Sequence, residues 1–297
     1  MPGKQVTELD ALPSFTDNSL LPVHNGAGLK KGLLSQLADY LGKKFSNPNL
    51  LINPDFKINQ RGATSYEKQG YSVDRWKIWN VTVTSNANGG ITVKNDKYTD
   101  TGTFLQYLEN ATEGDSTLSC YVTSVSGTVT MVADDNSQVV LKQGLNVVHT
   151  SKSTKAFTIF LNRGTNITLK WVKLEQGKVA TEFIAPNYAE EILKCQRFYV
   201  VLESSLAGYG ANNAIYIPFA RGVYMRNSRN VIFTGANKQT FLRVNGTGKQ
   251  ISFNTTNGYA NNQYLRVYTN PVDTSLNNTA IGVDLNDTTI SVDAEIY

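Results

Sequence analysis

The 297-residue chain contains only two cysteines, two histidines and three methionines. Cys120 and Cys195 fall in different predicted domains, so we expect two buried free thiols in preference to a disulfide. Neither cysteine nor histidine occurs at the spacing that zinc requires. His24 and His149 adjoin no nucleophile motif, and there is no GxSxG, HExxH or phosphate-binding glycine loop. These shortages disfavour zinc proteins and the common hydrolase and nucleotide-binding classes.

Long apolar runs and concentrated charge are missing as well. No run spans a membrane, and residues 1–13 include Lys4, Glu8 and Asp10, unlike a signal peptide. We therefore expect synthesis in a cytoplasm and no membrane insertion. The net charge of +4 is spread along the whole chain. Because nucleic-acid binding normally needs a concentrated cationic face, we expect no nucleic-acid partner.

Tyrosine and glycine are plentiful, with 15 and 23 residues, and threonine and asparagine are frequent. β-Branched and aromatic side chains suit strands, while Asn and Gly suit the turns between them. The length exceeds one compact core, which favours two domains plus an extension. We predict a mainly β fold: an N-terminal arm and short helix over residues 1–46, a jelly-roll β-sandwich over 47–187, and a second, smaller β-sandwich over 188–297.

The N-terminal part combines an irregular arm, residues 1–28, with an amphipathic pattern over residues 29–45. The apolar residues that recur at helical spacing include Leu29, Leu33, Leu37, Leu41 and Phe45. This pattern predicts a helix, which ends before Pro48. A helix this short is marginal alone, so its apolar face must pack on the next domain, on copies of itself, or on another protein.

Period-two alternation indicates strands from Leu50 onward. In the first domain we predict strands over residues 91–94, 104–108, 118–125, 128–132, 139–142, 145–148, 156–161 and 167–174. The last of these changes phase near Trp171, which indicates a β-bulge or a strand buried on both faces. Short strands with no helix between them favour an antiparallel jelly-roll sandwich.

The second domain is predicted to open with a helical turn over residues 189–194 and a strand over 198–202. Further strands are predicted over residues 214–219, 222–225, 230–233, 241–244, 250–253, 264–268 and 289–297. The loops between them are rich in Asn and Gly. This domain is near the lower size limit for a self-sufficient β-core, so oligomerisation through it is physically reasonable.

Three stretches resemble bacteriophage and prophage tail-fibre proteins. Residues 19–45 are similar to the leading segment of such fibres. Residues 50–76, with LLINPDF, KINQRG and GYSVDRW, resemble the opening of their carbohydrate-binding-module-like jelly roll. Residues 174–198 resemble its close, and the final DAEIY is similar to the usual ending of that family. No intramolecular chaperone domain and no shaft repeat is apparent in the sequence, so a short fibre or a capsid decoration is also compatible.

The resemblance implies a viral structural protein: a receptor-binding tail fibre, made in the bacterial host cytoplasm and located in the virion. Other virion proteins would hold its N-terminus, and it would form a homotrimer. Host cell-surface carbohydrate would be its outer partner. The first alternative is a head fibre or capsid decoration protein without an attachment role.

Aromatic residues are the main candidates for ligand binding, because sugar rings stack on flat side chains and their hydroxyls bind amides. The candidate ligand-binding residues are Trp79, Tyr209, Tyr259, Tyr264, Asn212 and Asn261. The strand-like surroundings of Trp76 and Trp171 place both in the sandwich core instead. No cofactor is expected apart from a structural calcium ion, for which Asp55 and Glu175 are the candidate ligands.

Catalysis is the least favoured function. A glycosidase needs only two carboxylates across a cleft, so a capsule-degrading enzyme stays as a second alternative. The acidic residues available to it are Asp74, Glu109, Asp134, Asp135, Glu190 and Glu191. Since acidic residues of this kind are usually solvated surface groups, we predict that the chain is not an enzyme and name no catalytic residue.

Overall fold

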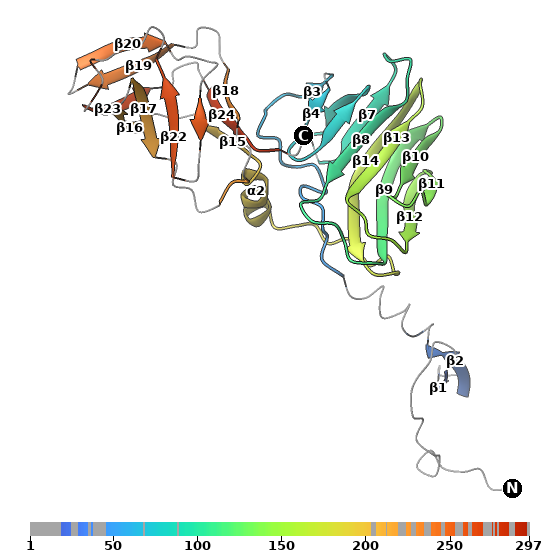
Figure 1. Ribbon diagram of the computed structural model, residues 1–297. Coiled ribbons are helices and arrows are strands. Elements are labelled where there is room, and N and C mark those ends of the chain that lie inside the picture. The colour runs from blue at the N-terminus through green and yellow to red at the C-terminus, as the bar shows by residue number, and fades with distance from the viewer. Residues whose placement is uncertain are drawn as a thin grey trace, which may run out of the picture.

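Figure 1 shows the computed structural model, in which two β-rich domains follow one another along the chain. The structure describes residues 19–24, 29–34, 37, 46–67, 69–87, 89–202, 206–211, 213–218, 224–226, 230–234, 239–244, 247–252, 258–260, 263–269, 275, 277, 279–284 and 289–295. The predictions made for Leu41, Phe45, Asn212 and Asn261 lie outside these residues.

The first domain is a sandwich of two antiparallel six-stranded sheets. The first sheet has the order β11-β10-β13-β8-β5-β4 and comprises β4 (Gly70–Tyr71), β5 (Lys77–Trp79), β8 (Gly102–Tyr107), β10 (Val129–Val132), β11 (Gln138–Val140) and β13 (Ala156–Leu161). The second has the order β12-β9-β14-β7-β6-β3 and comprises β3 (Ser65–Tyr66), β6 (Thr82–Ser85), β7 (Ile91–Asn95), β9 (Ser116–Ser126), β12 (Gly144–Thr150) and β14 (Thr165–Gln176). The mainly β prediction is confirmed, including the strands predicted between residues 91 and 174.

Aromatic rings fill the space between these two sheets. The ring of Trp76 stacks on Phe104 with centroids 4.7 Å apart, and Phe56 and Phe157 pack against its other sides at 5.2 and 6.0 Å. The Trp76 indole N–H donates to the backbone carbonyl of Asn53 at 2.9 Å, so its burial leaves no donor unpaired. Trp76 is fully buried, which confirms its predicted place in the core.

The predicted irregularity near Trp171 is a β-bulge in β14. The pairing of β14 with β9 shifts register between Thr168 and Leu169 and again between Leu169 and Trp171. Ile167 and Leu169 point into the core before the second shift, and Val172 and Leu174 do so beyond it. The shift turns Trp171 to the outer surface of the sheet.

The helix predicted over residues 29–45 is wrong at its start. Strand β2 (Leu29–Leu33) pairs antiparallel with β1 (Leu20–His24), Leu20 opposite Leu33. Leu34 and Leu37 are helical, and Leu37 is exposed. The sequence between the two strands contains Asn25-Gly26, the strongest short-range signal for a hairpin. A strand pair forms its backbone hydrogen bonds locally, which competes with a short and marginal helix.

The second domain pairs a small sheet with a large one. The three-stranded sheet, in the order β15-β24-β18, comprises β15 (Tyr199–Leu202), β18 (Asn230–Thr234) and β24 (Thr289–Asp293). The seven-stranded sheet, in the order β20-β19-β23-β16-β17-β22-β21, comprises β16 (Leu206–Ala211), β17 (Ala214–Pro218), β19 (Gln239–Val244), β20 (Thr247–Ser252), β21 (Tyr259–Ala260), β22 (Tyr264–Tyr268) and β23 (Thr279–Asp284). The strand predicted over residues 222–225 is wrong at Tyr224 and Met225, which lie in irregular structure.

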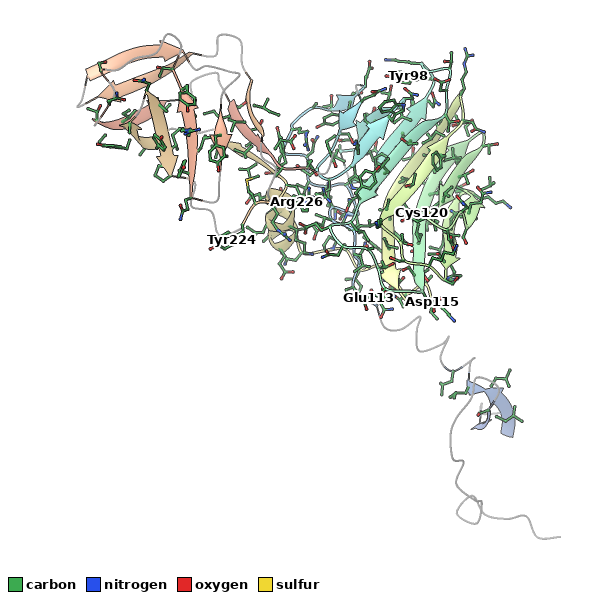
Figure 2. All side chains as sticks on the ribbon, viewed as in Figure 1. Tyr98, Glu113, Asp115, Cys120, Tyr224 and Arg226 are labelled. Atoms are coloured by element: carbon green, nitrogen blue, oxygen red, sulfur yellow. The ribbon has the colours of Figure 1, made fainter. Side chains whose placement is uncertain are left out.

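Helix α2 (Tyr188–Gln196) connects the two domains, close to Tyr224 and Arg226 in Figure 2. The side chain of Asn187 caps it by accepting hydrogen bonds from two backbone N–H groups of the first turn. On its buried side, Glu191 accepts the backbone N–H of Asn53 at 2.6 Å. The helix therefore packs against the opening loop of the first domain, and the helical turn predicted over residues 189–194 is confirmed.

A buried ion-pair network joins the end of β24 to the first domain. Glu295 accepts hydrogen bonds from the guanidinium and, at 3.1 Å, from the backbone N–H of Arg75. Arg61 lies 3.7 Å from Glu295 and 3.6 Å from Asp74, and its guanidinium stacks on the ring of Tyr199 at 3.8 Å. Both Arg75 and Glu295 are 1% exposed, so this contact is shielded from water.

Burial governs the titration of the network. It raises the pKa of Glu295 and of Asp74, and this outweighs the opposite effect of the neighbouring arginines. The folded chain thus binds more protons than the unfolded one in the acid range. These two groups make the free energy of unfolding fall as pH rises through their folded pKa values.

We predict that Glu295→Ala lowers the free energy of unfolding by about 3–5 kcal/mol, because it leaves the buried cation of Arg75 without its partner. The matched control is Glu67→Ala, which removes an exposed partner of Lys97 and leaves stability unchanged. Urea titration followed by tryptophan fluorescence and circular dichroism measures both variants. Equal midpoints for the two would show that the network does not hold the domains together.

Both cysteines are buried free thiols, as predicted. Cys120 lies among the strands of the first domain (Figure 2), and Cys195 lies in α2. Burial raises the pKa of Cys120 to about 12 and also raises that of Cys195. The reactive thiolate is therefore scarce at neutral pH.

We predict that the native protein resists an aromatic disulfide reagent at pH 8, whereas urea-unfolded chain reacts at both thiols. The rate of reaction in native buffer, read by absorbance, checks this. Rapid labelling of Cys195 in native buffer would mean that α2 opens from the first domain far more often than its buried contacts allow.

Candidate functional site

One surface of the seven-stranded sheet carries a group of tyrosines around Arg266. Strand register places Tyr209 beside Tyr216, Tyr216 beside Arg266, and Arg266 beside Tyr259, in one row across four strands. Tyr264 and Tyr268 flank Arg266 along β22, two residues away on either side, and so share its side of the sheet. We call this surface the tyrosine face, composed of Tyr209, Tyr216, Tyr259, Tyr264, Arg266 and Tyr268.

The alternation of residues along each strand determines which side the tyrosines occupy. On β17, Ile215 and Ile217 are buried in the domain core, and on β22, Leu265 and Val267 are buried. The residues between them must then point outward, because side chains of a strand alternate between its two faces. The core residues therefore set the direction of Tyr216, Tyr264, Arg266 and Tyr268.

The tyrosine rings lie close enough to form a continuous surface. The ring of Tyr264 lies 5.3 Å from that of Tyr216 and 6.3 Å from that of Tyr259, both tilted. Tyr209 and Tyr259 are nearly half exposed, at 48% and 45%. Tilted rings this close stabilise one another. The surface offers flat apolar area together with hydrogen-bonding groups.

Arg266 is the cation at the centre of the tyrosine face. Its guanidinium carbon lies 5.4 Å from the ring centroid of Tyr259 and 5.2 Å from that of Tyr268, within range of cation–π attraction. A side-chain hydrogen bond with Tyr216 raises its pKa further. The side chain is therefore held in place by tyrosines.

Three predicted ligand residues, Tyr209, Tyr259 and Tyr264, come together on this surface. The sequence analysis missed Tyr216, Arg266 and Tyr268. The signal was present in the strand YLRVY, where tyrosine and arginine alternate with buried Leu and Val. That alternation predicts that Tyr264, Arg266 and Tyr268 share one face of the sheet, if the outward-pointing residues are considered together.

Trp79, the fourth predicted aromatic, lies in the other domain. It stands 50% exposed at the end of β5, opposite Thr103 of β8, which in turn pairs with Phe160 of β13. Trp79 and Phe160 therefore occupy aligned positions on strands β5 and β13, which are separated by β8 and lie about 10 Å apart. The prediction that Trp79 is exposed is confirmed, but it does not join the tyrosine face.

Trp171 was predicted in the core, which is wrong. It packs on the outer surface of its sheet, stacked on Phe183 with centroids 4.6 Å apart and next to Tyr121 at 6.0 Å. The bulge before it changes the phase of the strand and turns the ring outward. Together with Leu145 and Val147 these rings line a hollow of about 640 Å³.

The two predicted calcium ligands contact different cations. Glu175 lies 3.2 Å from the ammonium of Lys173 and accepts the backbone N–H of Thr181 at 2.9 Å. Asp55 pairs with Lys57 at 2.7 Å. Among the described residues there is no group of three or more His, Cys, Asp or Glu side chains suited to a metal ion. The structure does not bring Asp55 and Glu175 into a shared site.

Several carboxylates considered for catalysis are held in structural contacts. Asp74 belongs to the network with Arg61, and Glu191 binds Asn53 and Lys194. Glu109 lies 3.0 Å from Arg197, at the edge of a hollow of about 500 Å³. These contacts give each of the three carboxylates a structural partner.

Comparison with known proteins assigns no family. No protein-family model and no curated protein matches this sequence. Among solved structures, salicylate 1,2-dioxygenase from Pseudaminobacter salicylatoxidans is 9% identical and aligns over 67% of this chain and 72% of its own, with a TM-score of 0.11. Protein Ylba from E. coli is 11% identical over 80% and 88%, also with a TM-score of 0.11. Scores this low support no inference about fold or function.

A separate finding concerns membranes. In the part of the chain that the structure describes, no helix has both the length and the apolar character needed to cross a bilayer.

We predict that the tyrosine face contributes little to folding. Tyr259→Ala should change the melting temperature by no more than a few degrees, because its side chain is nearly half exposed on the outer side of the sheet. Leu265→Ala, on the opposite side of the same sheet, should cost about 2–5 kcal/mol. Calorimetry of both variants tests this. A large loss for Tyr259→Ala would make the tyrosines a structural layer instead of a free surface.

Proposed function

We propose that this chain is a bacteriophage virion fibre protein that attaches to saccharides on the host surface, and that the tyrosine face is its attachment site. The observation that carries the proposal is the gathering of five tyrosines around Arg266 on the outer side of the seven-stranded sheet. The resemblance of residues 19–45, 50–76 and 174–198 to tail-fibre proteins supports placing the chain in a virion.

The chemistry of the tyrosine face suits sugars. The apolar C–H side of a pyranose ring packs on an aromatic ring, and phenol hydroxyls exchange hydrogen bonds with sugar hydroxyls. Tyrosine has few rotatable bonds, so fixing it against a ligand costs little conformational entropy. Neighbouring rings held at 5.3 and 6.3 Å need little rearrangement on binding.

Attachment would be strengthened by copy number. A homotrimer presents three tyrosine faces, and linked sites can raise avidity by about 10²–10⁴-fold over one weak site. The buried contact between Arg75 and Glu295 holds the distal domain on the first domain. A firm connection of this kind keeps several sites in a usable relative orientation.

The proposed role is binding, without catalysis. Three of the six carboxylates considered for a glycosidase, Glu109, Asp74 and Glu191, are engaged with arginine, lysine or backbone groups. Cleavage of the bound polysaccharide by the purified chain, with loss of cleavage in Asp134→Asn, would replace this part of the proposal.

Tyr209→Ala combined with Tyr259→Ala is predicted to weaken attachment to bacterial envelopes by about tenfold or more, since about 1.4 kcal/mol corresponds to a factor of ten. Tyr188→Ala combined with Tyr224→Ala, also a loss of two exposed rings, is the matched control. Surface plasmon resonance over envelopes from a panel of strains measures both. If the double variant binds as wild type does, the attachment site lies elsewhere.

The second part of the proposal is that residues 1–46 fasten the chain to other virion proteins. Deletion of residues 1–46 should abolish incorporation into phage particles while the purified remainder keeps its β-rich spectrum. Immunogold imaging of particles then separates a tail position from a head position. The head-fibre or capsid-decoration alternative makes two different predictions. The label would lie at the head, and phage particles that lack the chain would still attach to the host as wild-type particles do.

A further inference from the structure

Arg266 differs from the four arginines that form ion pairs with carboxylates in the described part of the chain. Arg61, Arg75 and Arg197 each lie within 3.7 Å of at least one carboxylate, and Arg226 lies 3.9 Å from Glu109. No carboxylate of the described residues forms an ion pair with Arg266. Its contacts are aromatic rings and a hydrogen bond with Tyr216. The charge of this guanidinium is therefore uncompensated in the part of the chain that the structure describes.

One donor of Arg266 is also unused. The Nε atom is shielded from solvent and has no hydrogen-bond partner. A shielded donor without an acceptor is unfavourable, and this cost would be removed if an acceptor came beside it.

We infer that the tyrosine face takes an acidic saccharide, with the carboxylate of a uronic or sialic acid held by Arg266 and the sugar ring packed on the surrounding tyrosines. This inference rests on the proposed function and names its ligand class. Arg forms paired hydrogen bonds with a planar carboxylate, and these are about twice as strong as neutral ones. The aromatic rings hold the guanidinium in one orientation, so little order must be gained when the carboxylate arrives.

The geometry favours a carboxylated sugar over other occupants. A neutral sugar would leave the central cation without a counter-charge, which is costly once a ligand excludes water. A protein partner would also have to bring an acidic group to the same point. The small flat area between Tyr209 and Tyr259 spans four strands, about 15 Å, which matches a few sugar rings better than a full protein interface.

The test is an array of bacterial surface polysaccharides, each spotted in native form and after carbodiimide–borohydride reduction of its carboxylates to alcohols. Wild-type chain should bind one or more carboxylated polymers and lose at least about tenfold in affinity on the reduced twin. Arg266→Gln should lose a similar factor on the native polymer. Arg266→Lys should lose less, because it keeps the charge, and Tyr188→Ala should lose nothing.

Several results would overturn the inference, and they separate it from the proposed function. One such result is equal binding to native and reduced polymers that is kept in Arg266→Gln and lost in the double variant of Tyr209 and Tyr259. This result would support saccharide attachment and contradict an acidic ligand. Selective binding to phosphate-bearing polymers, which reduction does not alter, replaces carboxylate by phosphate. Binding to no polymer and no envelope counts against both. A drop in oligomer mass for Arg266→Gln in light scattering would assign the tyrosine face to contacts between copies.

Discussion

The ion pair between Arg75 and Glu295 is the contact on which the arrangement of this molecule depends. It joins residues that are 220 positions apart, in the loop before β5 and just after β24, and neither side chain is accessible to water. Arg75 also donates to the backbone carbonyl of Tyr107 and lies 3.5 Å above the ring of Phe198. Burying such a pair costs desolvation, so its value lies in fixing one orientation of the two domains more than in net stability.

That orientation matters because the distal domain is small. Its two sheets enclose a core of mostly Val, Ile and Leu, and one side of the larger sheet remains open to solvent. The alternation of β22 places tyrosines and Arg266 on this open side. A sheet covered on both faces would have apolar core residues at these positions. A sheet with one solvated face can devote that face to recognition without weakening the packing beneath it.

Sequence patterns predicted the strands well and the irregular features less well. Alternation located β9, β14 and β22, and the size and polarity of Trp76 and Cys120 fitted their burial. The N-terminal leucines misled, because Leu29 and Leu33 fit a helical stripe and also a hairpin strand, and Asn25-Gly26 was the better guide. Trp171 misled because a bulge shifts its phase. For the site, single tyrosines were chosen from loops, whereas the shared face follows only from the register between strands.

We propose above all that the tyrosine face, on the seven-stranded sheet of the second domain, holds a host saccharide. The most direct measurement is a crystal structure of the chain with an oligosaccharide released from an envelope that it binds. The account predicts a sugar ring on Tyr216 and Tyr264, with its acidic group against Arg266. An oligosaccharide bound instead beside Trp79 or in the hollow of Trp171 and Phe183, with the tyrosine face bare, would contradict it.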